Sequence, residues 1–185
     1  MMPFSSENEG MKTFFRNTAR IFFLIAAFVL FSGELFAAPK VTEKRQKLIS
    51  CALSYQGSPY VYGGTDPATG IDCSAYVALV ARKAVSIDLP RRAHDIYNAV
   101  EKITIKEREP GDLVFFKNDM NSSKVTHVGI YCGVYHGPLK KFEGKRVFIS
   151  AISDGPRTGV QLELMEAKFW KQHYFATGRI LPSTR

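Results

Sequence analysis

The chain has 185 residues, of which 45% are apolar, with 25 Lys and Arg against 17 Asp and Glu. This length suits one domain of ordinary size, and the apolar content excludes an intrinsically disordered chain. Three Cys are too few for a disulfide scaffold and odd in number. The net charge of +8 predicts an anionic partner, which is nucleic acid, a membrane surface or an acidic polymer.

The N-terminal segment, residues 1–38, has the layout of a secretory signal peptide. Three basic residues within positions 12–20 precede an apolar run over 21–31, and Ala37 and Ala38 supply small residues. This apolar run is about half the roughly 20 residues that span a bilayer. We expect export, with the segment either cleaved or kept as an anchor that associates with the membrane. Export makes nucleic acid an unsuitable partner and an acidic envelope polymer a better one.

The remaining chain, residues 39–185, is predicted to form one domain. Helices come first, over 41–56, over 72–83 after the turn-rich stretch 57–70, and over 93–100. Strands follow at 113–116, 128–135, 146–151, 160–164 and 176–181, with a short helical segment over 165–173. This order indicates an α+β fold in which N-terminal helices pack on an antiparallel sheet of about five strands.

Cys73 and His127 carry the chemistry that the sequence suggests. Cys73 follows the glycine-rich loop at the start of a helix, and Asp72 is placed to cap that helix. Backbone N–H groups at a helix start favour an anion, so we expect a lowered pKa for the Cys73 thiol. His127 opens the run H-V-G-I-Y. Either residue alone is more often structural, but together they match the nucleophile and base of cysteine hydrolases.

The motifs around these two residues resemble those of NlpC-type cell-wall cysteine peptidases. Residues 57–77 read G-S-P-Y-V-Y-G-G-T-D-P-A-T-G-I-D-C-S-A-Y-V, similar to the family's P-Y-x-W-G-G loop before a D-C-S helix. Further motifs follow in the family's order: L-P-R at 89–91, P-G-D-L-V-F-F at 110–116, H-V-G-I-Y at 127–131 and G-R-I-L at 178–181. The resemblance covers about residues 44–181 and implies a papain-like core.

The resemblance implies a role for each matching residue. Cys73 would be the nucleophile that attacks a peptide carbonyl, and His127 the general base that later protonates the leaving amine. Tyr60 would help to hold the oxyanion, with backbone N–H groups at the start of the Cys73 helix. Arg91 and Arg92 lie near the chemistry in the family pattern and are candidates for binding a substrate carboxylate.

Two departures from the family pattern bear on the site. The family usually carries a His in an I-H-A context, where this chain reads I-S-A at 149–151. Ser150 therefore stands at the position that orients His127, and its hydroxyl can accept a hydrogen bond from the imidazole. Asp154 is the alternative orienting residue. Tyr62 replaces the usual Trp of the glycine loop, which alters the wall of the pocket more than the chemistry.

The other Cys, His and basic residues leave several interpretations open. Cys51 and Cys132 form a disulfide after export, leaving Cys73 free, or stay reduced and buried. No H-E-x-x-H or comparable His spacing occurs, so we expect no metal and no other cofactor. Basic runs are usually solvated faces, although attraction to an anionic wall polymer is the functional interpretation. These runs comprise Lys40, Lys44, Arg45 and Lys47, and then Lys140, Lys141, Lys145 and Arg146.

The sequence as a whole predicts an exported, monomeric cysteine endopeptidase of the bacterial periplasm or cell envelope. The resemblance implies hydrolysis of peptidoglycan stem peptides through an acyl-enzyme, at the bond between D-glutamate, through its γ-carboxyl, and the following diamino acid. An amidase or acyltransferase on the same scaffold is the first alternative. A catalytically weak envelope-binding protein is the second, because Ser150 replaces the family's usual His.

Overall fold

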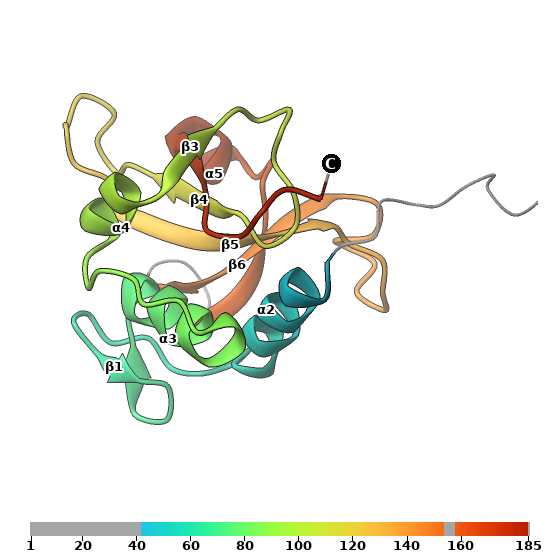
Figure 1. Ribbon diagram of the computed structural model, residues 1–185, viewed down its shortest axis with the longest axis horizontal. Helices are drawn as coiled ribbons and strands as arrows, with labels where there is room; N and C mark the ends of the chain where they lie inside the picture. Colours follow the sequence, from blue (N-terminus) through green and yellow to red (C-terminus); the bar gives the residue numbers. More distant parts are fainter. Residues whose placement is uncertain (1–41, 154–157, 185) are drawn as a thin grey trace, which may run out of the picture. The chain divides into compact units, whose positions relative to one another are not determined.

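Figure 1 shows the computed structural model, which describes residues 42–153 and 158–184. The predictions for residues 1–38 and for Asp154 lie outside these ranges. The described residues pack as one compact unit. Within the described ranges, no helix is long and apolar enough to cross a bilayer.

The helices begin and end close to the residues that the sequence predicts. α2 is Glu43–Ser54, α3 is Cys73–Val85 and α4 is Ala93–Ala99. The short hairpin of β1 (Thr65–Asp66) and β2 (Gly70–Ile71) lies between α2 and α3. Asp72 caps α3, and Ser86 ends it in the left-handed conformation with φ 58°.

The main sheet is antiparallel throughout, with the strand order β3-β8-β4-β5-β6-β7 in the described part of the chain. The predicted α+β class with helices on an antiparallel sheet is therefore confirmed. In the described part of the chain this sheet has six strands, against about five predicted, because β3 has only three residues and no alternating pattern. The strands are β3 (Glu101–Ile103), β4 (Leu113–Phe116), β5 (His127–Val134), β6 (Arg146–Ile152), β7 (Gly159–Leu164) and β8 (Tyr174–Arg179).

Each face of the sheet buries its own apolar cluster. α2 and α3 cover one face, where Val128 and Ile130 of β5 join the core residues of both helices. The opposite face carries Phe116, Tyr131 and Phe148, and Phe116 and Phe148 contact Trp170 of α5 (Lys168–His173). Because side chains alternate along β5, His127 lies on the α5 side, whereas Cys73 approaches from the helix side.

Candidate active site

Cys73 is the first residue of α3, and the cap of that helix is tightly bonded. The Asp72 carboxylate accepts hydrogen bonds from the Ala75 backbone N–H at 2.8 Å and the Ser74 hydroxyl at 3.0 Å. Arg91 adds a bidentate ion pair, with Nη2 to Oδ2 at 2.7 Å and Nη1 to Oδ1 at 3.0 Å. These bonds fix the start of α3 and with it the position of the thiol.

The glycine loop is held against the same cap. Arg91 donates to the Gly63 carbonyl at 2.9 Å, and the Asp72 backbone N–H donates to the Gly64 carbonyl at 3.1 Å. A Cβ at Gly64 would lie 2.3 Å from the Gly70 carbonyl oxygen, so only glycine fits there. Arg91 thus joins the loop to the helix start.

The partial burial of Asp72 raises the pKa of its carboxyl, but hydrogen bonds outweigh this effect. Arg91, the Ala75 N–H and the Ser74 hydroxyl together lower that pKa below its usual value. Asp72 is therefore an anion at neutral pH and a stable cap. The Arg91 side chain, which the sequence marks as a candidate for substrate binding, is engaged in this cap.

β5 and β6 separate at the end of the sheet where His127 begins β5. Their pairing in the described chain runs from Val134 opposite Arg146 to Ile130 opposite Ile149 and stops there. Pairing between β6 and β7 continues to Ile152. The gap leaves the Val128 backbone open to other partners.

Two side chains use the Val128 backbone in this gap. The Ser150 hydroxyl, which is fully buried, donates to the Val128 carbonyl at 2.7 Å. The Val128 backbone also hydrogen-bonds the Cys73 thiol. Because the single hydroxyl proton of Ser150 is already donated, Ser150 can contact the imidazole of His127 only as an acceptor. The gap thus brings α3, β5 and β6 together at one point.

Cys73 and His127, which are far apart in the sequence, line the same cleft of about 1010 Å³. Tyr60 and Tyr62 line it from the glycine loop, and Arg92 lines it at the start of α4. Tyr62 is 90% exposed and stands at the rim. The cleft therefore collects the predicted nucleophile, base and oxyanion support, whereas Ser150 is fully buried and does not line it.

Trp170 is a residue of this site that the sequence analysis missed. It lines the cleft, and its ring centroid lies 5.0 Å from that of His127, with 31° between the planes. Phe116 contacts the same imidazole at 5.9 Å. Trp170 is the only Trp in the chain, and this is the one sequence feature that could have marked it as a residue of the site. From sequence alone, its short helix is predicted only to connect two strands.

The expected lowering of the Cys73 thiol pKa is wrong. Burial raises that pKa to about 11, and the negative charge of Asp72 adds to the rise. Hydrogen bonding from the backbone of Val128, Ser74 and Cys73 acts in the opposite direction but is weaker in sum. The backbone N–H groups at the helix start therefore lower the thiol pKa as predicted. Desolvation of the thiolate raises this pKa by more. The thiol is protonated at neutral pH, and attack on a carbonyl requires a base to remove its proton.

Alkylation of Cys73 is expected to be slow at pH 7 and to rise about tenfold per pH unit toward pH 11, because only the thiolate reacts. The rate can be followed with iodoacetamide by mass spectrometry of the Cys73 peptide. The urea-unfolded chain supplies the reference for an unshifted thiol. A rate that levels off below pH 7 would show a thiolate–imidazolium pair in the resting protein instead.

Cys51 and Cys132 both carry free thiols, so the structure has the reduced state of the two that the sequence left open. Burial raises the pKa of the half-buried Cys132 to about 12, which makes its thiol unreactive at neutral pH. Among residues 42–153 and 158–184, no three His, Cys, Asp or Glu side chains are grouped as metal ligands.

Comparisons with known proteins agree with this geometry. A sequence profile described as the NlpC/P60 family matches residues 57–179. The chain is 40% identical over 129 residues to the bifunctional muramidase/DL-endopeptidase CwlT of Bacillus subtilis, covering 70% of this chain and 34% of that protein. It is 34% identical over 156 residues to the murein DD-endopeptidase MepH of Escherichia coli, covering 81% and 52%.

A solved structure also matches. It is an NLP/P60 family protein of Staphylococcus aureus, similar to lipoprotein, with a TM-score of 0.59 and 32% identity. The match covers 80% of this chain and 46% of that one. The chain thus spans between a third and about half of the length of these relatives.

Proposed function

Because the chain belongs to the NlpC/P60 family, we propose that it is a cysteine endopeptidase that hydrolyses peptidoglycan stem peptides. The observation that carries the proposal is the meeting of Cys73 and His127 in one cleft, with Cys73 at the capped start of α3. Relatives named as muramidase/DL-endopeptidase and murein DD-endopeptidase support the substrate class.

In the proposed reaction, His127 removes the proton of the Cys73 thiol as the sulfur attacks the peptide carbonyl carbon. The tetrahedral intermediate collapses when its C–N bond breaks, and His127 returns the proton to the leaving amine. A water, deprotonated by His127, then attacks the thioester. This step releases the carboxylic acid and restores the thiol. The raised pKa of Cys73 supports proton removal during attack, without a thiolate present beforehand.

The oxyanion is best placed at the start of α3. The backbone N–H groups of Cys73 and Ser74 lie at this helix start and lower the pKa of the Cys73 thiol, so they favour negative charge there. The Tyr60 side chain lines the cleft and supplies a further donor. We assign substrate positioning to Arg92 and cap positioning to Arg91, because Arg91 is occupied by Asp72 and the Gly63 carbonyl. Ser150 is assigned to orient His127 as an acceptor.

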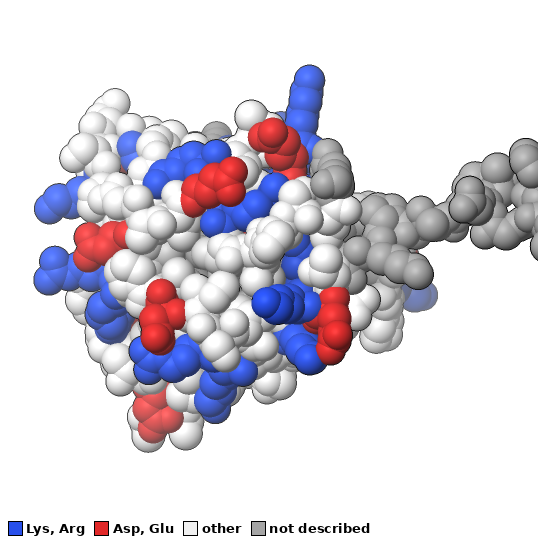
Figure 2. All heavy atoms as spheres, in the orientation of Figure 1, with Lys and Arg blue, Asp and Glu red and all other residues white. Residues whose placement is uncertain are grey.

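The proposal includes export to the periplasm or cell envelope, where peptidoglycan lies. A signal-like segment over residues 1–38 supports this location, as does a net charge of +8 against an anionic polymer. Figure 2 shows Lys and Arg side chains spread over the visible face among fewer Asp and Glu side chains. This distribution is compatible with general attraction to an acidic wall.

Digestion of purified sacculi is expected to release peptides that begin with the diamino acid and to leave on the glycan stems that end at the γ-carboxyl of D-glutamate. Mass spectrometry of the soluble products measures this directly. Loss of the whole stem peptide from the glycan would identify an amidase instead. Cleavage between D-alanine and a diamino acid would identify a DD-endopeptidase, and binding without products would identify an envelope-binding protein.

A further inference from the structure

The only Trp of the chain faces the predicted catalytic base. The Trp170 and His127 rings are 5.0 Å apart and tilted by 31°. The other rings around Trp170 meet it at steeper angles, namely 61° for Phe116, 85° for Phe148 and 86° for Phe169. The indole therefore presents a face to His127, while its edges and remaining surface contact the phenyl rings.

The indole is itself held rigidly. Trp170 is 8% exposed, and its Nε1–H donates to Glu163 Oε2 of β7 at 3.3 Å. Phe116 of β4 and Phe148 of β6 fix the ring from the sheet. Contacts from three strands leave the Trp170 side chain little rotamer freedom, so its face is a fixed surface beside the imidazole.

His127 begins β5 with its backbone paired to Phe116 of β4, and this pairing does not fix the plane of the imidazole ring. The pairing of β5 with β6 in the described chain stops at Ile130 and Ile149. Ser150 can contribute at most an acceptor, because its proton is donated to the Val128 carbonyl. Restricting an imidazole ring requires a second contact that fixes its plane.

We propose that Trp170 is a positioning residue for His127. Its indole face holds the imidazole plane toward the cleft and stabilises the imidazolium that forms when His127 takes the thiol proton, as an aromatic face does for a planar cation. The inference rests on the proposed function in that His127 is taken as the base. Misplacement of a catalytic group by about 1 Å costs as much as 10²-fold in rate, which leaves room for a measurable effect.

Two variants of the full chain separate positioning from simple packing. Trp170→Leu fills part of the space without an aromatic face, whereas Trp170→Phe keeps a face and lacks the indole N–H. We expect kcat on a soluble muropeptide to fall about tenfold in Trp170→Leu, with KM changed less than twofold. Trp170→Phe is expected to stay within about threefold of the wild type. Rates are compared at temperatures where circular dichroism shows each variant fully folded.

Nuclear magnetic resonance supplies a readout that does not depend on turnover. The chain has four His, so the Hε1 resonance of His127 can be assigned by its loss in His127→Asn. We expect this resonance to broaden or split in Trp170→Leu, as the ring samples more than one rotamer, and to remain single in Trp170→Phe. Lys171→Ala is the control on the same helix, since Lys171 is exposed and does not line the cleft, and we expect it to keep the wild-type kcat and a single His127 resonance.

The proposal is overturned if Trp170→Leu keeps wild-type kcat and a single His127 resonance. It is also overturned if a folded Trp170→Phe is as impaired as Trp170→Leu by both measurements. If the wild-type protein cleaves no peptide at all, the proposed function fails. The resonance comparison still decides whether Trp170 positions His127.

Discussion

Replacing Cys73 by alanine is expected to abolish the release of peptides from sacculi, with a loss of at least about 10³-fold in rate. The variant removes the sulfur that forms the acyl-enzyme and leaves the Asp72–Arg91 cap in place, since that cap does not involve the Cys73 side chain. Chromatography of released muropeptides against time measures the rate. Cys73→Ser is expected to be equally inactive while preserving the size of the side chain.

Cys51→Ala is the matched control for the Cys73 variants. Cys51 lies on α2, is half-buried and does not line the cleft. We expect this variant to keep at least half of the wild-type rate, which shows that removing a thiol as such has no effect. Release of peptides by Cys73→Ala at more than a few per cent of the wild-type rate would contradict the assignment of the nucleophile.

Residues carried by local motifs could be predicted from the sequence. Family membership, expected from the motif order, and the α+β class, expected from helices followed by strands, are both confirmed. The helix start at Cys73 follows from Asp72, a residue whose capping preference is local. The meeting of Cys73 and His127 depends on how β5 lies against α3, so it followed from the chemistry of the two residues and the family resemblance and not from a local pattern.

Effects that depend on tertiary surroundings could not be predicted. The thiol pKa is an example, because a helix start is visible in sequence whereas the 8% exposure of Cys73 is not. β3 is another, since its three residues are a strand only through their pairing with β8. Trp170 packs on His127 from a segment 43 positions further along the chain, and no spacing rule connects them.

Arg45 is the largest misreading of the sequence. It stands in a basic run that predicts a solvated face, since Arg is mostly exposed. The structure buries it completely, whereas Lys44 and Lys47 beside it are exposed. Its acidic partners Glu109 and Asp112 come from more than 60 residues further on, so no local pattern could identify the pair.

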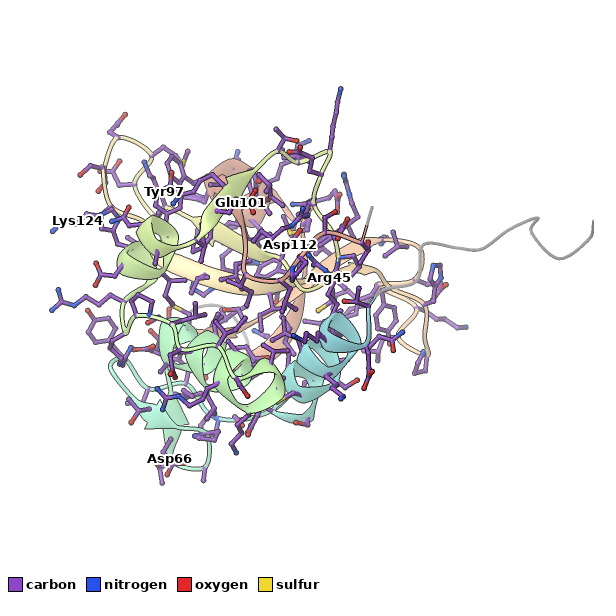
Figure 3. The ribbon with its side chains drawn as sticks, in the orientation of Figure 1. Arg45, Asp66, Tyr97, Glu101, Asp112 and Lys124 are labelled. Carbon is purple, nitrogen blue, oxygen red and sulfur yellow. The ribbon has the colours of Figure 1, made fainter. Side chains whose placement is uncertain are left out.

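The Arg45 guanidinium connects three distant segments. It donates to Asp112 at 3.0 Å, to the Pro110 carbonyl at 2.8 Å and to the carbonyls of Leu181 and Pro182 at 3.0 Å. Glu109 lies 3.4 Å away. Figure 3 shows Arg45 of α2 beside Asp112, which lies immediately before β4. The guanidinium thus fastens α2 and the C-terminal segment to the sheet.

Arg45→Met is therefore expected to lower the free energy of unfolding by about 3–5 kcal/mol, because it leaves buried carboxylates and carbonyls short of a donor. For a domain of this size the melting temperature should fall by roughly 10 °C or more. Urea titration followed by circular dichroism measures the change. Arg179 also pairs with Asp112 at 2.9 Å, so this carboxylate keeps one cationic partner in the variant.

Lys47→Ala on the same helix is the control for Arg45→Met. The Lys47–Glu43 pair is short at 2.6 Å, but its side chains are 62% and 79% exposed. Exposed pairs contribute little, so we expect a change below about 0.5 kcal/mol. Equal effects of the two substitutions would contradict a stabilising role for the buried network. The surface pair is the shorter of the two, so distance alone would predict the larger contribution for Lys47. A large effect of Arg45→Met alone would therefore show that burial determines how much the ion pair contributes to the free energy of unfolding.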